Sequence, residues 1–517
     1  MVIIQIQDEM TQIHSLVLLI NSMTLSERKA FKAKTGHARN SPNYTILFET
    51  IEKNNSSSVI ELRNEFQKRR PGASFETSTK YLFELILNVM LSLRQEQDSF
   101  YALFNMILKA RILYEKSMFV ESFEMLNEVM FLAEKYENYY AMLLASKLEL
   151  EYLLSLGFPN LSEKELLKKQ FKLNESLKYI RRINEHSSLF EILKHRVVNK
   201  GHPRTKKQKE ELNDLVYSEL SMVASQNLEN FEIQKLHQLF QSNYLISVGD
   251  YNSALRSYYE LSTLFEANKH LWSNPPIYYM NVLEGVLESL RGIRNYEGMT
   301  YFIEQLKKIK SSSVEFQLNL TCLTFQYELF PLLDCGNFSG SVELMKLYKN
   351  SLFDKFSSLD RDRQTELCLY TSLIYLGTSE YKKAHKFLNR IYLDVKNYSF
   401  LPRYRTIRLV NLIILYKLTD FDLIKYEIRS MKRDLSAAEK EYKIEHFLFR
   451  FLSKPPSAFS LHRYNQWEYV KDIIEEINHD VFEQQILRIF DFTAWVESQV
   501  KKTPLSQVLH SRVKEMH

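Results

Sequence analysis

The stretch Gly249-Asp250-Tyr251-Asn252-Ser253-Ala254-Leu255-Arg256-Ser257-Tyr258 decides how this chain folds. A glycine and an aspartate end one apolar helix, and an aromatic residue follows, with a small residue three positions later and a second aromatic after that. Residues three and four positions apart share one face of a helix, so Tyr251, Ala254 and Tyr258 line up on one side. We expect the first aromatic to fill the angle between two antiparallel helices and the small residue to let them approach.

The same sequence pattern recurs along the chain. In the second half its aromatics lie at 251, 296, 338, 381 and 421, with separations of 45, 42, 43 and 40 residues. So narrow a period indicates a helical repeat, in which stacked neighbours supply the core that one helix pair lacks. The residues expected to pack between helices are Phe119, Tyr251, Ala254, Tyr258, Tyr296, Phe338, Tyr381, Ala384 and Phe421.

Glycine and proline are scarce. The 517 residues contain 11 of each, which together make up about 4% of the chain, whereas these two residues make up roughly 12% in average usage. A β-rich protein needs many more turns than these residues can supply, so long helices are expected. Four glycines fall two or four residues before the repeat aromatics, namely Gly249, Gly292, Gly336 and Gly377. We expect each to end a first helix in the left-handed conformation, which glycine adopts without steric cost.

The recurring sequence pattern resembles the tetratricopeptide repeat, in which a turn glycine, an aromatic, an alanine and a further aromatic mark the packing of two helices. Gly249, Tyr251, Ala254 and Tyr258 are the best match, although the period of 40 to 45 residues exceeds the standard one of about 34. The resemblance covers residues 99–156 and 230–435. It implies an all-α fold, a right-handed α-solenoid of antiparallel helix pairs, and a protein that binds other chains.

Three regions are expected: a cluster of shorter helices over 1–96, the repeat array over 97–436 and capping helices over 437–517. Two degenerate repeats are expected between the array's two clear parts, because Gly157-Phe158-Pro159 and Gly201-His202-Pro203 both stop helices. The tail to about Lys502 should form two or three closing helices. The N-terminal helices are predicted over 24–36, 41–53, 57–68 and 76–95, the first with a capping box of Thr24 and Glu27.

Common catalytic signatures are missing from the sequence. It contains no Gly-rich phosphate loop, no HExxH and no GxSxG motif, so we expect no enzyme and no cofactor. Its three cysteines, Cys322, Cys335 and Cys368, lack metal-site spacing and read as reduced thiols. No secretion signal and no membrane-spanning stretch is apparent, which predicts a cytoplasmic protein that does not bind membranes.

Charge is unevenly distributed, although the net charge is only +5. Residues 161–210 hold fourteen Lys/Arg and six Glu, whereas residues 115–155 hold three Lys and eight Glu. Many cations lie around the Gly201-His202-Pro203 break, and they could bind an acidic protein or peptide partner, or an anion. The alternative is that they form a solvated surface that balances the charge of the acidic helices. The candidate residues are Arg181, Arg182, Lys194, Arg196, Lys200, Arg204, Lys206 and Lys207.

The leading interpretation is a non-enzymatic scaffold that binds a protein or peptide, with candidate groove residues Tyr244, Tyr278, Tyr279, Arg403, Arg405 and Arg408. The alternative is a transcriptional regulator, in which residues 24–95 form a helix-turn-helix-like head that binds DNA and the repeats act as a sensor. The break Arg69-Arg70-Pro71-Gly72 between two helices favours it. Against it, the helix that follows is too apolar to lie along a DNA groove.

Overall fold

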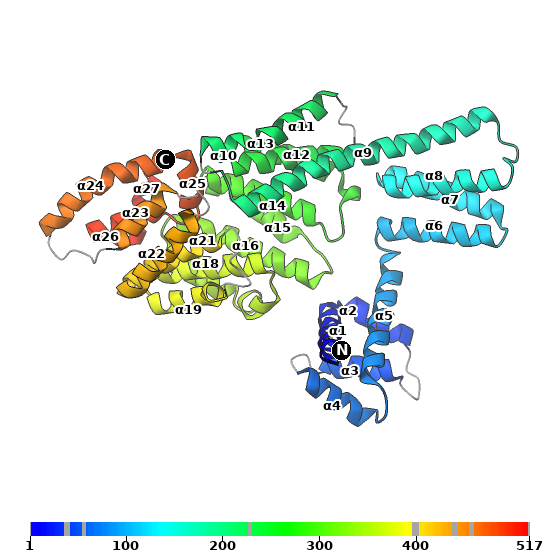
Figure 1. Cartoon of the computed structure of the whole chain (residues 1–517), viewed down its shortest axis with the longest axis horizontal. Helices are drawn as coiled ribbons and strands as arrows, with labels where there is room; N and C mark the ends of the chain where they lie inside the picture. The colour runs from blue at the N-terminus through cyan, green and yellow to red at the C-terminus, as the bar shows by residue number, and fades with distance from the viewer. Residues whose placement is uncertain are drawn as a thin grey trace. The chain divides into compact units, whose positions relative to one another are not determined.

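The structure is a computed structural model that describes residues 2–35, 42–53, 58–203, 205–225, 230–394, 403–436, 442–453 and 460–514. Every regular element within these ranges is a helix, and no strand occurs in them. Helices that follow one another along the chain pack side by side (Figure 1). The predicted all-α fold of packed neighbouring helices is therefore confirmed.

The chain divides into two compact units. Unit 1 contains Met1–Arg182 with the short segments Ser273–Pro275 and Ser311–Phe316. Unit 2 contains Ile183–Trp272, Pro276–Lys310 and Gln317–His517.

The first five helices of unit 1 surround one apolar core. Phe31, Phe48 and Phe66 are fully buried there, and α5 packs against each of the other four helices. The Thr24 backbone N–H donates to Glu27 Oε2 at 2.8 Å, and the Glu27 N–H donates to Thr24 Oγ1 at 3.1 Å, which confirms the predicted capping box. The helices are α1 (Val2–Ser22), α2 (Leu25–Thr35), α3 (Asn43–Lys53), α4 (Val59–Arg69) and α5 (Phe75–Arg94).

The rest of unit 1 is a row of antiparallel helices, α6 (Ser99–Glu115), α7 (Phe119–Lys135), α8 (Tyr139–Ser155) and the first part of α9 (Glu163–Lys200). Lys169 Nζ lies 2.6 Å from Glu149 Oε1, and Lys172 Nζ lies 3.5 Å from Glu134 Oε2. The basic start of α9 thus faces the acidic helices before it, which is one of the two arrangements that the charge distribution allowed.

The two degenerate repeats expected between residues 156 and 230 are not formed in the described part of this stretch. A single helix of 38 residues, α9, occupies Glu163–Lys200 and crosses from unit 1 to unit 2 at Arg182. The short helices α10 (Lys206–Glu210) and α11 (Asn213–Ser225) follow it. The prediction was wrong because no glycine or proline interrupts residues 160–200, so nothing forces the chain to turn there.

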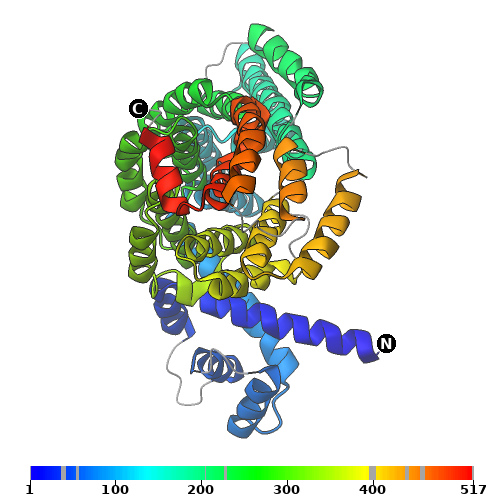
Figure 2. The same cartoon turned by 90° about the vertical axis from the view of Figure 1, so that its left-hand side faces the viewer.

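Unit 2 contains five successive helix pairs, which follow one another around a curve in Figure 2. The first helices of the pairs are α12 (Phe231–Ser247), α14 (Ile277–Gly292), α16 (Val314–Asp334), α18 (Arg361–Gly377) and α21 (Tyr404–Lys417). Their second helices are α13 (Tyr251–Ala267), α15 (Tyr296–Lys308), α17 (Phe338–Leu347), α19 (Tyr381–Tyr392) and α22 (Phe421–Ser436). Short 3-10 turns lie at Lys269–Leu271 and Phe353–Ser358.

The turn inside each pair has the same backbone geometry. Asp250 shows it: its N–H donates to the Leu245 carbonyl at 2.9 Å. Its side chain also accepts from the Ser253 N–H at 3.1 Å, a cap that Glu380 does not provide in its own turn. The residue two positions before each aromatic has a positive φ, which closes the first helix. These left-handed residues are Ser117, Glu137, Gly249, Arg294, Gly336, Ser379 and Thr419.

The role predicted for the four glycines holds for two of them. Gly249 and Gly336 are left-handed, with φ of 83° and 75°. Gly292 and Gly377 instead lie four residues before their aromatics and end helices in ordinary helical geometry. A Cβ on Gly377 would lie 2.1 Å from Cδ1 of Phe338, and one on Gly292 would lie 2.4 Å from Cγ of Tyr251. These two glycines therefore let the aromatic of the preceding pair lie flat on the next first helix.

The remaining predicted packing residues line the same interfaces. Tyr251, Ala254, Tyr258, Phe338 and Ala384 are buried, and Phe119, Tyr296, Tyr381 and Phe421 are half-buried.

The sequence led us to expect that the C-terminal helices only cap the last pair. In the structure they do more. Four helices lie between residues 439 and 502 rather than two or three, and a fifth follows. They contact the turns of several pairs: Gln485 Nε2 donates to the Ser247 carbonyl at 3.1 Å, and Lys417 Nζ donates to Gln499 Oε1 at 2.9 Å. These helices are α23 (Lys443–Leu452), α24 (Ser460–His479), α25 (Val481–Leu487), α26 (Phe492–Lys501) and α27 (Leu505–Lys514).

Candidate functional site

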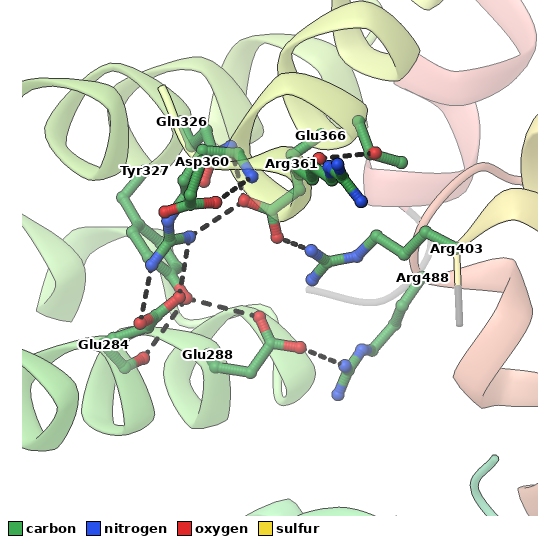
Figure 3. Close-up of polar contacts among 11 residues, drawn as sticks. Glu284, Glu288, Gln326, Tyr327, Asp360, Arg361, Glu366, Arg403 and Arg488 are labelled. Carbon is green, nitrogen blue, oxygen red and sulfur yellow. Dashed lines mark hydrogen bonds and ion pairs between the residues drawn. The ribbon is translucent and has the colours of Figure 1, made fainter. Parts of the chain in front are cut away.

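A set of charged and polar side chains gathers on the first helices of three successive pairs in unit 2. Two further members enter from connecting segments, one just before α21 and one just after α25 (Figure 3). Charged side chains rarely leave solvent unless they are paired, so their gathering inside a helical array marks a candidate site. We call this set the charged cluster, and its members are Glu284, Glu288, Gln326, Tyr327, Arg363, Glu366, Arg403 and Arg488.

Arg363 on α18 connects the two ends of the cluster. Its Nη1 and Nη2 each lie 3.0 Å from a carboxylate oxygen of Glu284 on α14, and Nη1 lies 2.8 Å from Glu366 Oε2. Arg363 and Glu284 are 79 residues apart, which is close to two repeat periods. Side chains two repeats apart meet only where successive first helices converge, on the inside of a curved array. The charged cluster therefore lies on the inner face of unit 2.

Glu366 is the most buried carboxylate of the cluster, with 5% of its side chain exposed. Besides Arg363, it accepts a hydrogen bond from Gln326 Nε2 at 2.8 Å, and its Oε1 pairs with Arg403. A buried carboxylate is stable only when its oxygens are satisfied, and three donors satisfy this one. Glu366 therefore holds Gln326, Arg363 and Arg403 in place.

Glu288 lies at the other end of the cluster. Its Oε2 accepts from the Tyr327 hydroxyl at 3.4 Å, and its Oε1 pairs with Arg488. Burial alone would raise the pKa of Glu288, but Arg488, Arg291 and Arg403 outweigh burial and hold the pKa below its usual value. Glu288 is therefore a carboxylate at neutral pH.

Arg291 on α14 fixes the segment that carries Arg488. It is 4% exposed, and its Nε and Nη2 each lie 3.0 Å from a carboxylate oxygen of Asp334. Its Nη2 also donates to the backbone carbonyl of Arg488 at 2.7 Å, and its guanidinium carbon lies 3.6 Å from the centre of the Phe330 ring. The connection after α25 is thus tied to the inner face through its main chain, which leaves the Arg488 side chain available.

Arg403 is the least compensated cation of the cluster. Its side chain is 39% exposed, and Glu366 is its one ion-pair partner in the described ranges. Burial lowers the pKa of Arg403, and the nearby Glu288 does not offset that effect. For Arg363, by contrast, Glu284 outweighs burial and raises the pKa well above its usual value. Arg403 therefore has capacity for a further acceptor.

Arg488 and His202 carry nitrogens that lack a partner. Arg488 Nε and Nη1, and His202 Nδ1, are buried and accept or donate no hydrogen bond among the described residues. Burial and then the positive charge of Arg488 lower the pKa of His202 to about 4, so its imidazole is neutral at pH 7. Buried polar atoms normally find partners, so the unpartnered nitrogens of Arg488 and His202 are unusual.

A recess of about 710 Å³ lies among α24, α26 and α27 in unit 2. It is lined by Trp467, Lys471 and Lys501 among others, and Lys501 Nζ lies 3.9 Å from the centre of the Trp467 ring. Four lining residues are shared with a pocket of about 50 Å³ that reaches Arg291 and Arg488. The recess lies in the size range of ligand pockets, which is about 300–1,000 Å³.

Two of the predicted basic residues have defined surroundings in unit 2. Arg196 binds both carboxylate oxygens of Asp214, at 2.7 and 2.6 Å, so it connects α9 to α11. Lys194 is exposed on α9, and its Nζ lies 5.6 Å from the centre of the Phe190 ring on the same helix.

The other predicted basic residues lie along α9 and α10. Arg181 and Arg182 end the part of α9 that belongs to unit 1, and Lys206 and Lys207 are exposed on α10. The structure does not describe the Lys200 side chain or Arg204.

The three predicted groove tyrosines have different surroundings. Tyr279 is buried, stacks on Trp272 with ring centres 4.1 Å apart and donates its hydroxyl to Glu266, which makes it part of the core. Tyr244 packs, half-buried, against an apolar core cluster. Tyr278 is exposed, and Lys235 Nζ lies 4.2 Å from its ring centre. Tyr278 alone among them presents a ring to solvent.

The three predicted groove arginines divide in the same way. Arg405 pairs with both carboxylate oxygens of the fully buried Glu445. Arg408 pairs with Glu427 and with Asp434, the latter at 2.6 Å. Both connect neighbouring helices, whereas Arg403 belongs to the charged cluster. The structure brings Arg403 together with none of the predicted tyrosines.

The sequence interpretation missed every other member of the charged cluster, as well as His202. One signal was present: Glu284 and Glu288 lie within the apolar run Val282-Leu283-Glu284-Gly285-Val286-Leu287-Glu288, where a carboxylate on a buried face needs a partner. Those partners lie one and two repeats away, at separations of 39 and 79 residues. No local pattern indicates which cations they are.

Comparison with known proteins finds no relative. No protein-family model, no curated protein and no solved structure matches this chain. Among the described residues, no helix is both long enough and apolar enough to span a lipid bilayer.

Proposed function

We propose that this protein is a binding scaffold rather than an enzyme, a right-handed tetratricopeptide-like α-solenoid that holds a peptide or protein segment against the inner face of unit 2. The charged cluster carries the proposal. It combines fixed carboxylates with the part-exposed side chain of Arg403 and the unpartnered nitrogens of Arg488. Peptides offer complementary donors and acceptors along their backbone and side chains.

The geometry also supports a binding role. The Arg363–Glu284 and Tyr327–Glu288 contacts hold the cluster before any ligand arrives, so a partner needs to order few protein side chains. A separate recess of about 710 Å³ among the C-terminal helices offers further room for a ligand in unit 2. The three free cysteines, Cys322, Cys335 and Cys368, fit the reducing conditions of the cytoplasm, where we place the protein.

Selection of binders from a displayed library of random short peptides, with the full-length chain as bait, tests this function. We expect enriched peptides that share a motif, and direct binding of a synthetic copy measured by fluorescence anisotropy. Arg363→Met serves as the site variant, because it leaves Glu284 and Glu366 without their shared partner. A library that yields no binder to the wild-type chain would refute the proposal.

The DNA-binding alternative has no specific support in the fold of unit 1. Arg69 Nη2 lies 2.8 Å from Glu49 Oε2, and its Nη1 lies 3.1 Å from Thr50 Oγ1, so its guanidinium is engaged within the helical cluster. Lys68 and Lys80 are exposed. The regulator hypothesis predicts binding to duplex DNA that weakens steeply with salt and disappears when Lys68, Arg69, Arg70 and Lys80 are neutralised.

A further inference from the structure

Three nitrogen-bearing side chains meet in unit 2 from segments that lie outside the repeat helices. His202 follows α9, Arg403 immediately precedes α21, and Arg488 follows α25. Arg488 pairs with Glu288, and Arg403 pairs with Glu366. Figure 3 shows each of the two guanidinium groups directed at its own carboxylate within the charged cluster. The charges of Arg488 and Arg403 both act on Glu288 and on His202.

Arg488 has hydrogen-bonding capacity that the cluster does not use. Its Nε and Nη1 are buried without a partner in the described part of the chain. Guanidinium groups carry donors only, so the missing partner must be an acceptor. Burial costs a cation its hydration, and the existing carboxylates do not fully compensate Arg403. An acceptor that also carries negative charge satisfies both requirements.

The charge of the surroundings selects the kind of anion. Within the charged cluster, the carboxylates of Glu284, Glu288 and Glu366 balance the guanidinium groups of Arg363, Arg403 and Arg488. A dianion such as a phosphate monoester would add two negative charges beside Glu288, whereas a carboxylate adds one and matches the planar geometry of a guanidinium.

We propose that Arg403 and Arg488 bind a carboxylate of the peptide partner, supplied by an acidic side chain or by the peptide's C-terminus. This inference rests on the proposed peptide-binding function and names the chemistry of its ligand. Arg488 contributes through Nε and Nη1, and Arg403 through the donors that Glu366 does not use. The sequence-based expectation of an acidic partner came from the basic segment around Gly201, whereas the structure assigns this role to residues farther along the chain.

Arg403→Gln is the informative variant. It removes the charge, but Glu366 keeps Arg363 and Gln326 as partners, so the fold should persist. Arg256→Gln is the matched control, because Arg256 is exposed on α13, a second helix outside the cluster. Circular dichroism establishes that both variants are folded before binding is measured.

The peptide experiment uses binders selected on the full-length chain. We expect them to contain Asp, Glu or a required free C-terminus, and to bind Arg403→Gln about tenfold or more weakly than the wild type or Arg256→Gln. Twin peptides with Asn or Gln for the acidic residue, or with an amidated C-terminus, identify which carboxylate is bound. Binders that tolerate both twins and the Arg403→Gln change would overturn this inference and leave the proposed peptide-binding function intact.

A second probe tests the anion site without any peptide. Sodium glutarate should raise the unfolding temperature of the wild type and of Arg256→Gln above that in sodium chloride of equal ionic strength, because a ligand of the folded state stabilises it. Arg403→Gln should show no such rise. An equal rise in all three proteins, or no rise in the wild type, would overturn the carboxylate site, whatever the library yields.

Discussion

Helices α6–α8 of unit 1 and the five pairs of unit 2 use the same turn but differ in what connects them. In unit 1 the contacts are local: Tyr114 stacks on Tyr152 with ring centres 3.6 Å apart, and the Ser122 hydroxyl donates to the Ala110 carbonyl at 2.7 Å. In unit 2, contacts also join residues 79, 197 and 200 positions apart. The repeat chemistry therefore stacks neighbours in both units, while the helices of unit 2 are also joined by contacts that span 79 to 200 positions.

Among the changes that test this difference between the two units, removal of residues 437–517 should have the largest effect. It deletes Trp495 and Phe492, which are buried almost completely, together with Arg488 and its contacts to α14. Loss of two large buried aromatics alone costs unit 2 more than about 5 kcal/mol. We expect hydrogen exchange to accelerate throughout α14 and α16 and to stay unchanged in α7. Unchanged protection in α14 would show that neighbour stacking suffices in unit 2 as well.

Gly377→Ala tests the packing of one pair on the next. The new Cβ would lie 2.1 Å from the Phe338 ring, so the helices must separate, at a cost of about 1–3 kcal/mol in the free energy of unfolding. Gly298→Ala is the control, since its Cβ would meet only the side chain of Asn295, at 3.1 Å, and its effect should stay within about 1 kcal/mol. Urea denaturation measures both. Equal effects would mean that the close approach of Phe338 is unimportant.

Acid should weaken unit 2 through His202. In the unfolded chain this imidazole titrates near pH 6.5, whereas in the fold its pKa is about 4. Between these values the unfolded state binds a proton that the folded state does not, so stability falls as pH is lowered from 6.5 towards 4, by up to about 3 kcal/mol. His202→Asn should flatten this dependence in urea titrations at successive pH values. Burial also lowers the pKa of His186, so part of the slope should remain.

The smallest effect is expected for the ion pairs that join α9 to its neighbours in unit 1. Lys172→Ala should change the free energy of unfolding by less than about 0.5 kcal/mol, because Lys172 and Glu134 are both exposed. Lys169→Ala should cost about 1–2 kcal/mol, because it leaves the buried carboxylate of Glu149 without its cation. Thermal unfolding at low and at high salt distinguishes the effects of the two substitutions. Equal losses would contradict the role given to burial.

The candidate site was predicted only in part, for a physical reason that its residues make plain. Arg403, Arg405 and Arg408 were all predicted to line a groove, yet Arg405 and Arg408 pair with Glu445 and Glu427 instead. Which arginine stays available depends on which carboxylates the next helices present. That depends on how successive helices are rotated, and spacing along the chain does not encode rotation.

The sequence by itself determined the all-helical fold, the helix pairs and their turns. These features depend on short-range chemistry: a left-handed residue, a capping side chain such as Asp250 and an aromatic followed by a small residue all act within a few positions. The tertiary structure alone decided that α9 runs unbroken and that Gly292 and Gly377 serve packing. It also decided that Glu284 meets Arg363 and that Arg488 reaches Glu288, because small rotations between repeats add up to a curvature that brings distant residues together.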